Sequence, residues 1–301
     1  MCAMAVDSKY LQILPDEIFP ARERAAWMIR MEEGVSFSRR LLMLLKQLLP
    51  PFVAFVVFIG GWELIAALTH APVYLVPKPS DIVKAAIENR SGLWVSVRTT
   101  TFEAVLGFIL SIILGIAGAI LLASSKWIEK SVYPYAIILQ TIPIVAIAPL
   151  IVIWFDAGMN AIVIITFLIG FFPMLSNTLI GLNSTDQNMS NLFYLYNANG
   201  FQTMWKLRIP AALPYIVAGL KISCTLSVVG AIVGEYIAGI GGGQGGLGYA
   251  ITYAAARLKT PYLFACGLSA SALGIVFFLM VNAFAKWLLS SWHESEMKRD
   301  N

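Results

Sequence analysis

Charged residues are scarce in this chain, since Asp, Glu, Lys and Arg together account for 13% of its 301 residues. A soluble domain carries about 25%, and 58% of this sequence is apolar, so a soluble enzyme and a disordered chain are excluded. Cysteine is scarce too, with three residues in all, and that small number excludes a disulfide scaffold. The composition therefore indicates a polytopic membrane protein.

Metal-binding, nucleotide-binding and catalytic patterns are also missing. The two histidines, His70 and His293, lie far apart in the sequence, and no Cys-x-x-Cys occurs, so we expect no metal site. The phosphate-binding pattern Gly-x-x-x-x-Gly-Lys-Ser/Thr is absent, so we expect the chain not to bind ATP itself. No Ser/His pair, Asp pair or His/Glu cluster falls at membrane depth, so we expect no catalytic residues and no intramembrane enzyme.

Six apolar segments are each long enough to cross a bilayer, which takes about 20 residues of helix. We therefore predict an all-α fold, a polytopic membrane helical bundle with about six transmembrane helices. The predicted spans are 52–69, 99–123, 131–155, 159–182, 212–238 and 262–289.

The predicted domain organisation has three parts. Residues 1–50 mix charged and apolar residues at helical spacing, which predicts a cytoplasmic arm with a helix on the membrane surface; a poorly ordered tail is the alternative. Residues 51–290 form the predicted transmembrane domain, and 291–301 form a cytoplasmic tail.

The distribution of Lys and Arg predicts the orientation. With a cytoplasmic N-terminus, fourteen of these residues fall in inside segments and six in outside loops, so both termini are predicted to be cytoplasmic. Without the arm 1–50 the totals are seven against six and decide nothing. The net charge of +4 does not indicate nucleic-acid binding, because the basic residues lie mostly at the ends of spans.

A long mixture of polar and aromatic residues, 184–211, joins the fourth and fifth predicted spans, and such loops usually have a function. We expect a first short helix over 191–196, capped by Ser190 or Asn188, and a second over 201–207. Apolar side chains would be exposed on both helices. An exposed apolar patch marks either a protein partner or lipid, and the residue pattern leaves both interpretations open.

The stretch 195–221 resembles the coupling-loop signature of the permeases of ABC importers. The branch that it resembles is the nitrate, sulfonate and taurine group, which includes permeases for thiamine pyrimidine precursors and riboflavin. The resemblance implies a fold like that of type I ABC importer permeases. Further matching segments, which together cover about residues 55–290, are Trp62 with Glu63, 75–80, 100–107, 140–143, 148–149, 230–235 and 246–249.

The chain departs from the general signature at two points. Where the signature begins with an acidic residue and two alanines, this chain has Asn-Leu-Phe at 191–193. Where the signature has a glycine, this chain has Asn197, which can adopt the same left-handed turn. The resemblance implies that this loop docks on an ATP-binding subunit. The residues implied in the contact are Asn191, Leu192, Phe193, Tyr196, Asn197, Ala198, Gly200, Trp205 and Pro210.

The resemblance also implies partners and a location. It implies two ATP-binding subunits that hold ATP and Mg²⁺, an extracytoplasmic substrate-binding protein, a permease homodimer and the lipid bilayer of a bacterial plasma (inner) membrane. It implies no cofactor in this chain and no nucleic-acid partner. The implied substrate is a small polar solute, with a pyrimidine thiamine precursor or riboflavin slightly favoured over nitrate, sulfonate or taurine. The alternative function is a secondary transporter not coupled to ATP, although no internal repeat of the kind such proteins carry is visible.

Polar residues and prolines inside the spans are candidates for the translocation pathway. Glu235 closes the fifth span and is interpreted as a gate near the outer mouth, with an interfacial carboxylate in water as the alternative. For Asn177 the alternative is a hydrogen bond between helices. The candidate set is Gln140, Thr141, Pro143, Pro149, Asn177 and Glu235.

Two further expectations concern the second span. Its small residues Gly107, Gly115 and Gly118 predict close packing against another helix. Glu103 is expected to lie at the membrane interface or to pair with Arg98.

Overall fold

A computed structural model of the chain describes residues 49–69, 72–238 and 245–290. The described residues form helices and short connections, with no strand among them. They belong to two compact units, of which the first contains the helix Leu49–Leu68 and the second begins at His70. The predicted surface helix of the N-terminal arm and the C-terminal tail 291–301 lie outside the described residues.

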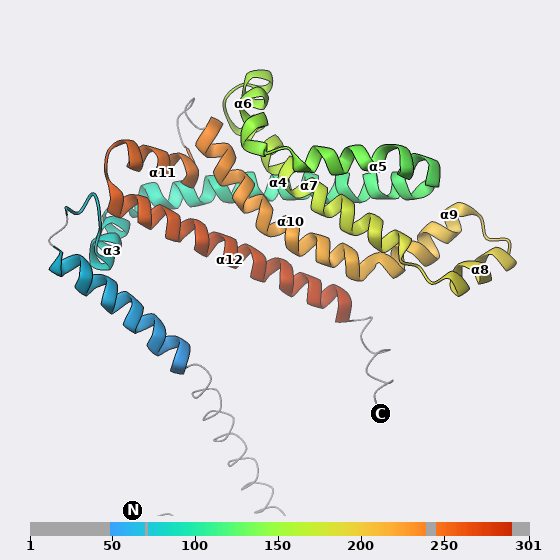
Figure 1. Ribbon diagram of the computed structural model, residues 1–301, viewed down its shortest axis with the longest axis horizontal. Helices are drawn as coiled ribbons and strands as arrows, with labels where there is room; N and C mark the ends of the chain where they lie inside the picture. Colours follow the sequence, from blue (N-terminus) through green and yellow to red (C-terminus); the bar gives the residue numbers. More distant parts are fainter. Residues whose placement is uncertain (1–48, 70–71, 239–244, 291–301) are drawn as a thin grey trace, which may run out of the picture. The chain divides into compact units, whose positions relative to one another are not determined.

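The second unit is a helical bundle (Figure 1). Its elements in chain order are α3 (Pro79–Glu88), α4 (Arg90–Ser124), α5 (Lys126–Thr141), α6 (Ile144–Phe155), α7 (Met159–Asn183), α8 (Gln187–Leu195), α9 (Gly200–Thr203), a π-helical turn (Met204–Arg208), α10 (Ile209–Ala238), α11 (Leu247–Ala256) and α12 (Thr260–Ser290).

The prediction of about six membrane-spanning helices is confirmed, with one difference in the third. Five described helices are long and apolar enough to cross a membrane, and α5 with α6 would make a sixth span that is bent by 97°. The predicted span 131–155, in which Pro143 and Pro149 indicate a kink, is broken at 142–143. The reason is Pro143, which bars its predecessor from the helical region, and Ile142 accordingly has an extended conformation with ψ 124°.

The centre of the bundle is α7, which packs against α4 on one side and α10 on the other (Figure 1). Glycines on α4 allow this approach, as predicted. A Cβ atom at Gly115 would lie 2.8 Å from Cβ of Met174, and one at Gly118 would lie 3.0 Å from Cδ1 of Leu175. A larger residue would therefore force the two helices apart, and overpacking of this kind costs about 1–3 kcal/mol.

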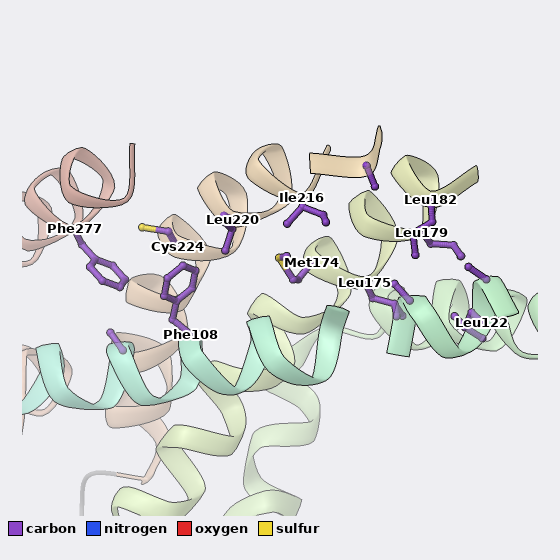
Figure 2. Close-up of a cluster of buried hydrophobic side chains, with 14 of the residues drawn as sticks. Phe108, Leu122, Met174, Leu175, Leu179, Leu182, Ile216, Leu220, Cys224 and Phe277 are labelled. Carbon is purple, nitrogen blue, oxygen red and sulfur yellow. The ribbon is translucent and has the colours of Figure 1, made fainter. Parts of the chain in front are cut away.

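The largest apolar core lies between α4, α7, α10 and α12 (Figure 2). Met174 and Leu179 of α7 are fully buried there, while Phe108 of α4 and Phe277 of α12 meet edge to face with ring centroids 5.4 Å apart. Cys224 is a buried free thiol in the same cluster and behaves as a small apolar residue. This core holds the inner parts of the four helices together and leaves the connecting segments at the two ends of the bundle.

The two ends of the bundle carry different connections (Figure 1). At one end, α8 and α9 link the C-terminus of α7 to the N-terminus of α10. At the other end, α11 lies between α10 and α12 and contacts the first half of α4. We call these the loop end and the α11 end.

Candidate functional site

The connection at the loop end is a pair of short, capped helices. Helix α8 begins after Asp186, whose side chain accepts a hydrogen bond of 2.6 Å from the backbone N–H of Asn188. The predicted helix over 191–196 therefore starts four residues earlier, at Gln187, and the predicted capping by Ser190 or Asn188 is wrong. Asp186 is the stronger cap, because a carboxylate also complements the positive end of the helix dipole.

A tight turn at Asn197 separates α8 from α9. Asn197 has φ 52°, the left-handed conformation that the sequence predicts for it. Its backbone N–H donates to the carbonyl oxygen of Tyr194 at 2.9 Å, and the N–H of Ala198 donates to that of Phe193 at 3.0 Å. The backbone of the turn is therefore held by the last turn of α8.

Helix α9 begins with a capping box. The Asn199 side chain accepts from the N–H of Gln202 at 2.8 Å, and the Gln202 side chain accepts from the N–H of Asn199 at 3.0 Å. The predicted second helix over 201–207 does not end at Pro210, because α9, the π-helical turn and α10 run on as one helix, Gly200–Ala238. The proline ring is tolerated because the π-helical turn precedes it, a local adjustment that relieves the freed carbonyl groups.

Large apolar side chains on this loop point away from the bundle. Tyr194 and Tyr196 are 82% and 80% exposed, and Leu195 is also exposed. On the next helix Phe201 and Trp205 are exposed, and their rings lie at 47° to each other with centroids 5.9 Å apart. Such a patch on a rigid, capped element marks a surface that another molecule covers.

The other residues implied in docking lie on the same loop. Asn191, Leu192 and Gly200 are exposed, and Phe193 and Ala198 are half-buried. Pro210 lies at the start of α10 and is half-buried, so it belongs to the base of the loop and not to its tip. Tyr194 and Leu195, which are absent from the predicted set, are among the most exposed apolar side chains of the loop.

A polar cluster joins three helices near the α11 end. Glu235 of α10 is 1% exposed, and its carboxylate accepts from the Thr100 hydroxyl at 2.6 Å and from the N–H of Gly248 at 2.5 Å. Thr100 in turn accepts from the N–H of Leu247 at 2.8 Å. The side chains of α4 and α10 thus cap the first two N–H groups of α11. The interfacial alternative for Glu235 is wrong, since the side chain is buried.

Glu103 belongs to the same cluster. It is 4% exposed and lies within hydrogen-bonding reach of Glu235, so the expected interfacial position is wrong. Its Oε2 atom has no hydrogen-bond partner among the described residues. Thr100, which is absent from the predicted site residues, carries the link between the helices. In the sequence, its place one turn before Glu103 in an apolar span is the signal that could have found it.

The remaining pathway candidates do not gather in one cluster. Gln140 and Thr141 are exposed at the end of α5, and Pro143 and Pro149 lie at the break and within α6. The predicted alternative for Asn177 is not seen, because its amide donates to the carbonyl of Pro173 within α7. Asn177 packs against Gly219 of α10, and Glu235 lies about 24 Å further along that helix at 1.5 Å per residue.

A cavity of about 600 Å³ opens at the α11 end. Tyr249 and Tyr253 of α11 line it with nearly parallel rings, whose centroids are 6.3 Å apart. Tyr262, Lys259 and Glu88 contribute further polar groups. Among the described residues no group of three or more His, Cys, Asp or Glu side chains is placed to hold a metal ion.

Comparison with known families gives a match over most of the bundle. Residues 93–290 match the model of the family described as binding-protein-dependent transport system inner membrane component. The matched range runs from the first turn of α4 to the end of α12, and it contains both the loop end and the polar cluster around Glu235.

Individual relatives match over most of both chains. A formylaminopyrimidine transport permease protein, ThiX, of Halalkalibacterium halodurans is 34% identical over 251 residues, which cover 83% of this chain and 98% of the relative. A probable ABC transporter permease protein of Haemophilus influenzae is 32% identical over 243 residues, 81% of this chain and 96% of the relative. A riboflavin transport system permease protein, RibX, of Chloroflexus aurantiacus is 29% identical over 236 residues, 78% and 86% of the two chains.

Proposed function

The chain belongs to the binding-protein-dependent transport system inner membrane component family and is a permease subunit of an ABC importer, and we propose that its α8–α9 loop docks on an ATP-binding subunit. It is a multi-pass inner-membrane protein and a transport subunit, not an enzyme. The observation that carries the proposal is the exposed aromatic surface of Tyr194, Tyr196 and Phe201 on a loop whose backbone is capped at both helices.

The proposed assembly contains two copies of this chain, two ATP-binding subunits and an extracytoplasmic binding protein. The described part of a single copy has one α8–α9 loop and up to six spans, which are too few to surround a pathway and engage two ATPases. ATP and Mg²⁺ would bind to the partner subunits. The permease residues would supply the docking surface and the pathway, for which Gln140, Thr141, Pro143, Pro149, Asn177 and Glu235 are the proposed residues.

In this proposal the loop end and both termini face the cytoplasm. The α11 end then faces outward, where a binding protein would deliver substrate. A reporter that is active only in the cytoplasm, fused at Asn301, is expected to be active, and a reporter that is active only outside is expected to be silent. The opposite result would place the α8–α9 loop on the outer side and end the docking proposal.

For the substrate we favour a small planar heterocycle, such as a pyrimidine thiamine precursor or riboflavin. Two relatives are named for formylaminopyrimidine and riboflavin transport, although others are named for aliphatic sulfonates and nitrate. The nearly parallel rings of Tyr249 and Tyr253 in the outward cavity support an aromatic substrate, because a planar ring gains about 1–3 kcal/mol from stacking on an aromatic side chain.

Replacing Tyr253 with leucine tests this substrate class. Loss of one stacking face is expected to raise the KM for heterocycle uptake about tenfold, whereas Tyr253→Phe keeps the ring and is expected to leave KM near the wild-type value. The measurement is uptake of labelled hydroxymethylpyrimidine, formylaminopyrimidine and riboflavin, with taurine, alkanesulfonates and nitrate as competitors. Transport of nitrate or a sulfonate alone, with equal KM in both variants, would contradict the proposal.

Reconstitution with the partner subunits tests the function itself. Uptake into vesicles is expected to require ATP, the ATP-binding subunits and the substrate-loaded binding protein. The alternative, a secondary transporter, predicts that an ion gradient drives uptake by the permease alone. If uptake continues without ATP and stops when the ion gradient is removed, the proposed function is wrong and the chain is a secondary transporter.

A further inference from the structure

Arg208 lies in the π-helical turn between α9 and α10 and hydrogen-bonds the ends of two other helices. Its Nε donates to the carbonyl oxygen of Leu182 at 2.9 Å, and its Nη2 donates to Oδ1 of Asn183 at 2.7 Å. Its Nη1 donates to the carbonyl oxygen of Ala123 at 2.8 Å. Three nitrogens of one side chain thus join the C-terminus of α7 to the C-terminus of α4.

These acceptors are groups that need a partner. The last four carbonyl groups of a helix have no intrahelical donor, and Leu182 and Ala123 belong to the last turns of α7 and α4. The negative ends of both helix dipoles also favour a cation at this place. The planar guanidinium reaches these acceptors from three separate nitrogen atoms in a fixed arrangement, whereas the donors of a lysine ammonium all lie on one nitrogen atom.

The link reaches a fourth helix. Asn183, which accepts from Arg208, donates through Nδ2 to Oε1 of Glu129 in the first turn of α5 at 2.7 Å. The α8–α9 loop directly follows α7 and directly precedes α10 in the chain. Helices α4 and α5 are not adjacent to the loop in the chain. The chain of hydrogen bonds through Arg208 and Asn183 supplies a connection at the base of the loop.

We propose that Arg208 is a positioning residue that transmits displacement of the α8–α9 loop to α4 and α5. The inference rests on the proposed docking of the loop on an ATP-binding subunit. With Arg208 in place, the inner ends of α4, α5, α7 and α10 move as one body when the loop moves. Without it, movement of the loop reaches α4 only through side-chain packing. Arg208 therefore acts on the number of substrate molecules moved per ATP hydrolysed, not on ATP hydrolysis itself.

The test is Arg208→Lys in the complete transporter reconstituted in vesicles. We expect normal capture of the ATP-binding subunits and normal basal ATP hydrolysis, with about a tenfold loss of substrate moved per ATP, a size typical of coupling between sites. Asn183→Ala removes one of the three bonds and the link to Glu129, so a smaller loss of the same kind is expected. Lys130→Gln, which removes an exposed positive charge from α5, serves as the matched control and is expected to behave as wild type.

The outcomes distinguish failure of the inference from failure of the proposed function. A wild-type ratio of transport to hydrolysis in Arg208→Lys would overturn the inference while leaving the proposed function intact. Loss of ATPase capture in both Arg208→Lys and Asn183→Ala would also overturn it, because the residues would then hold the docking surface in shape. Absence of ATP-dependent uptake in the wild-type complex would instead contradict the proposed function.

Discussion

Replacing Asn197 with proline is expected to abolish ATP-driven uptake while the permease remains inserted and folded. Proline fixes φ near −65° and lacks an N–H, whereas Asn197 has φ 52° and donates to the carbonyl of Tyr194. The turn between α8 and α9 would open, and the exposed rings of Tyr194 and Phe201 would lose their relative positions. The measurements are uptake and substrate-stimulated ATP hydrolysis in vesicles, with the melting temperature of the purified permease as the check on folding.

Asn197→Gly is the matched control for this variant. Glycine adopts the left-handed conformation without strain and keeps the N–H, so uptake is expected to stay near the wild-type level. Ala198→Glu is a second disruptive change, and it leaves Asn197 in place. It is expected to weaken docking because a new charge buried in the docking surface costs several kcal/mol unless it is paired. Normal uptake in both Asn197→Pro and Ala198→Glu would contradict docking through this loop and would favour a loop that rests on lipid.

Replacing Glu235 with leucine is expected to reduce uptake by about tenfold or more and to lower the melting temperature. The change removes the acceptor for the N–H of Gly248, and a buried group left without a partner costs about 1–3 kcal/mol. The Thr100 hydroxyl also loses Glu235 but keeps the carbonyl oxygen of Ser96 as an acceptor. Helix α11 would lose one of its two side-chain caps. The α8–α9 loop lies at the opposite end of the bundle (Figure 1), so if it docks as proposed, capture of the ATP-binding subunits should not change.

Two threonine variants distinguish loss of uptake through the polar cluster from loss of uptake through general damage to α4. Thr100→Val removes the hydroxyl that joins Glu235 to the N–H of Leu247, and a loss of uptake in the same direction is expected. Thr99→Val alters the neighbouring residue, which is exposed in part and bonds only the Val95 carbonyl of its own helix among the described contacts. Equal effects of the two threonine variants, or a Glu235→Leu variant with wild-type uptake, would contradict the role given to this cluster.

Local preferences of single residues account for what the sequence predicts well. Asn197 adopts the left-handed turn because asparagine tolerates positive φ. The glycines of α4 face α7 closely because a bundle of apolar helices brings its small residues to the contact. Apolar length alone predicts the membrane-spanning helices. In each of these cases the signal is the type of a single residue or the composition of one continuous segment.

Contacts between distant segments account for the features that the sequence does not predict. Glu235 is bonded to Thr100, which is 135 positions away in the chain, and only the packed bundle shows that the two meet. The burial of Glu103 follows from the same packing. The N-terminal cap of α8 was missed for another reason, since several polar residues from Ser184 to Ser190 are acceptable caps and the choice of Asp186 depends on where the helix begins.

The uninterrupted helix Gly200–Ala238 has a mechanical consequence. Its 39 residues extend over about 58 Å at 1.5 Å per residue, nearly twice the thickness of the hydrocarbon core. A rod of this length amplifies small rotations: a tilt of about 5° about one end displaces the other by about 5 Å, close to the rise of one helical turn. A rotation of about 5° about the Phe201 end would thus be enough to move Glu235, and with it the start of α11, by about 4 Å.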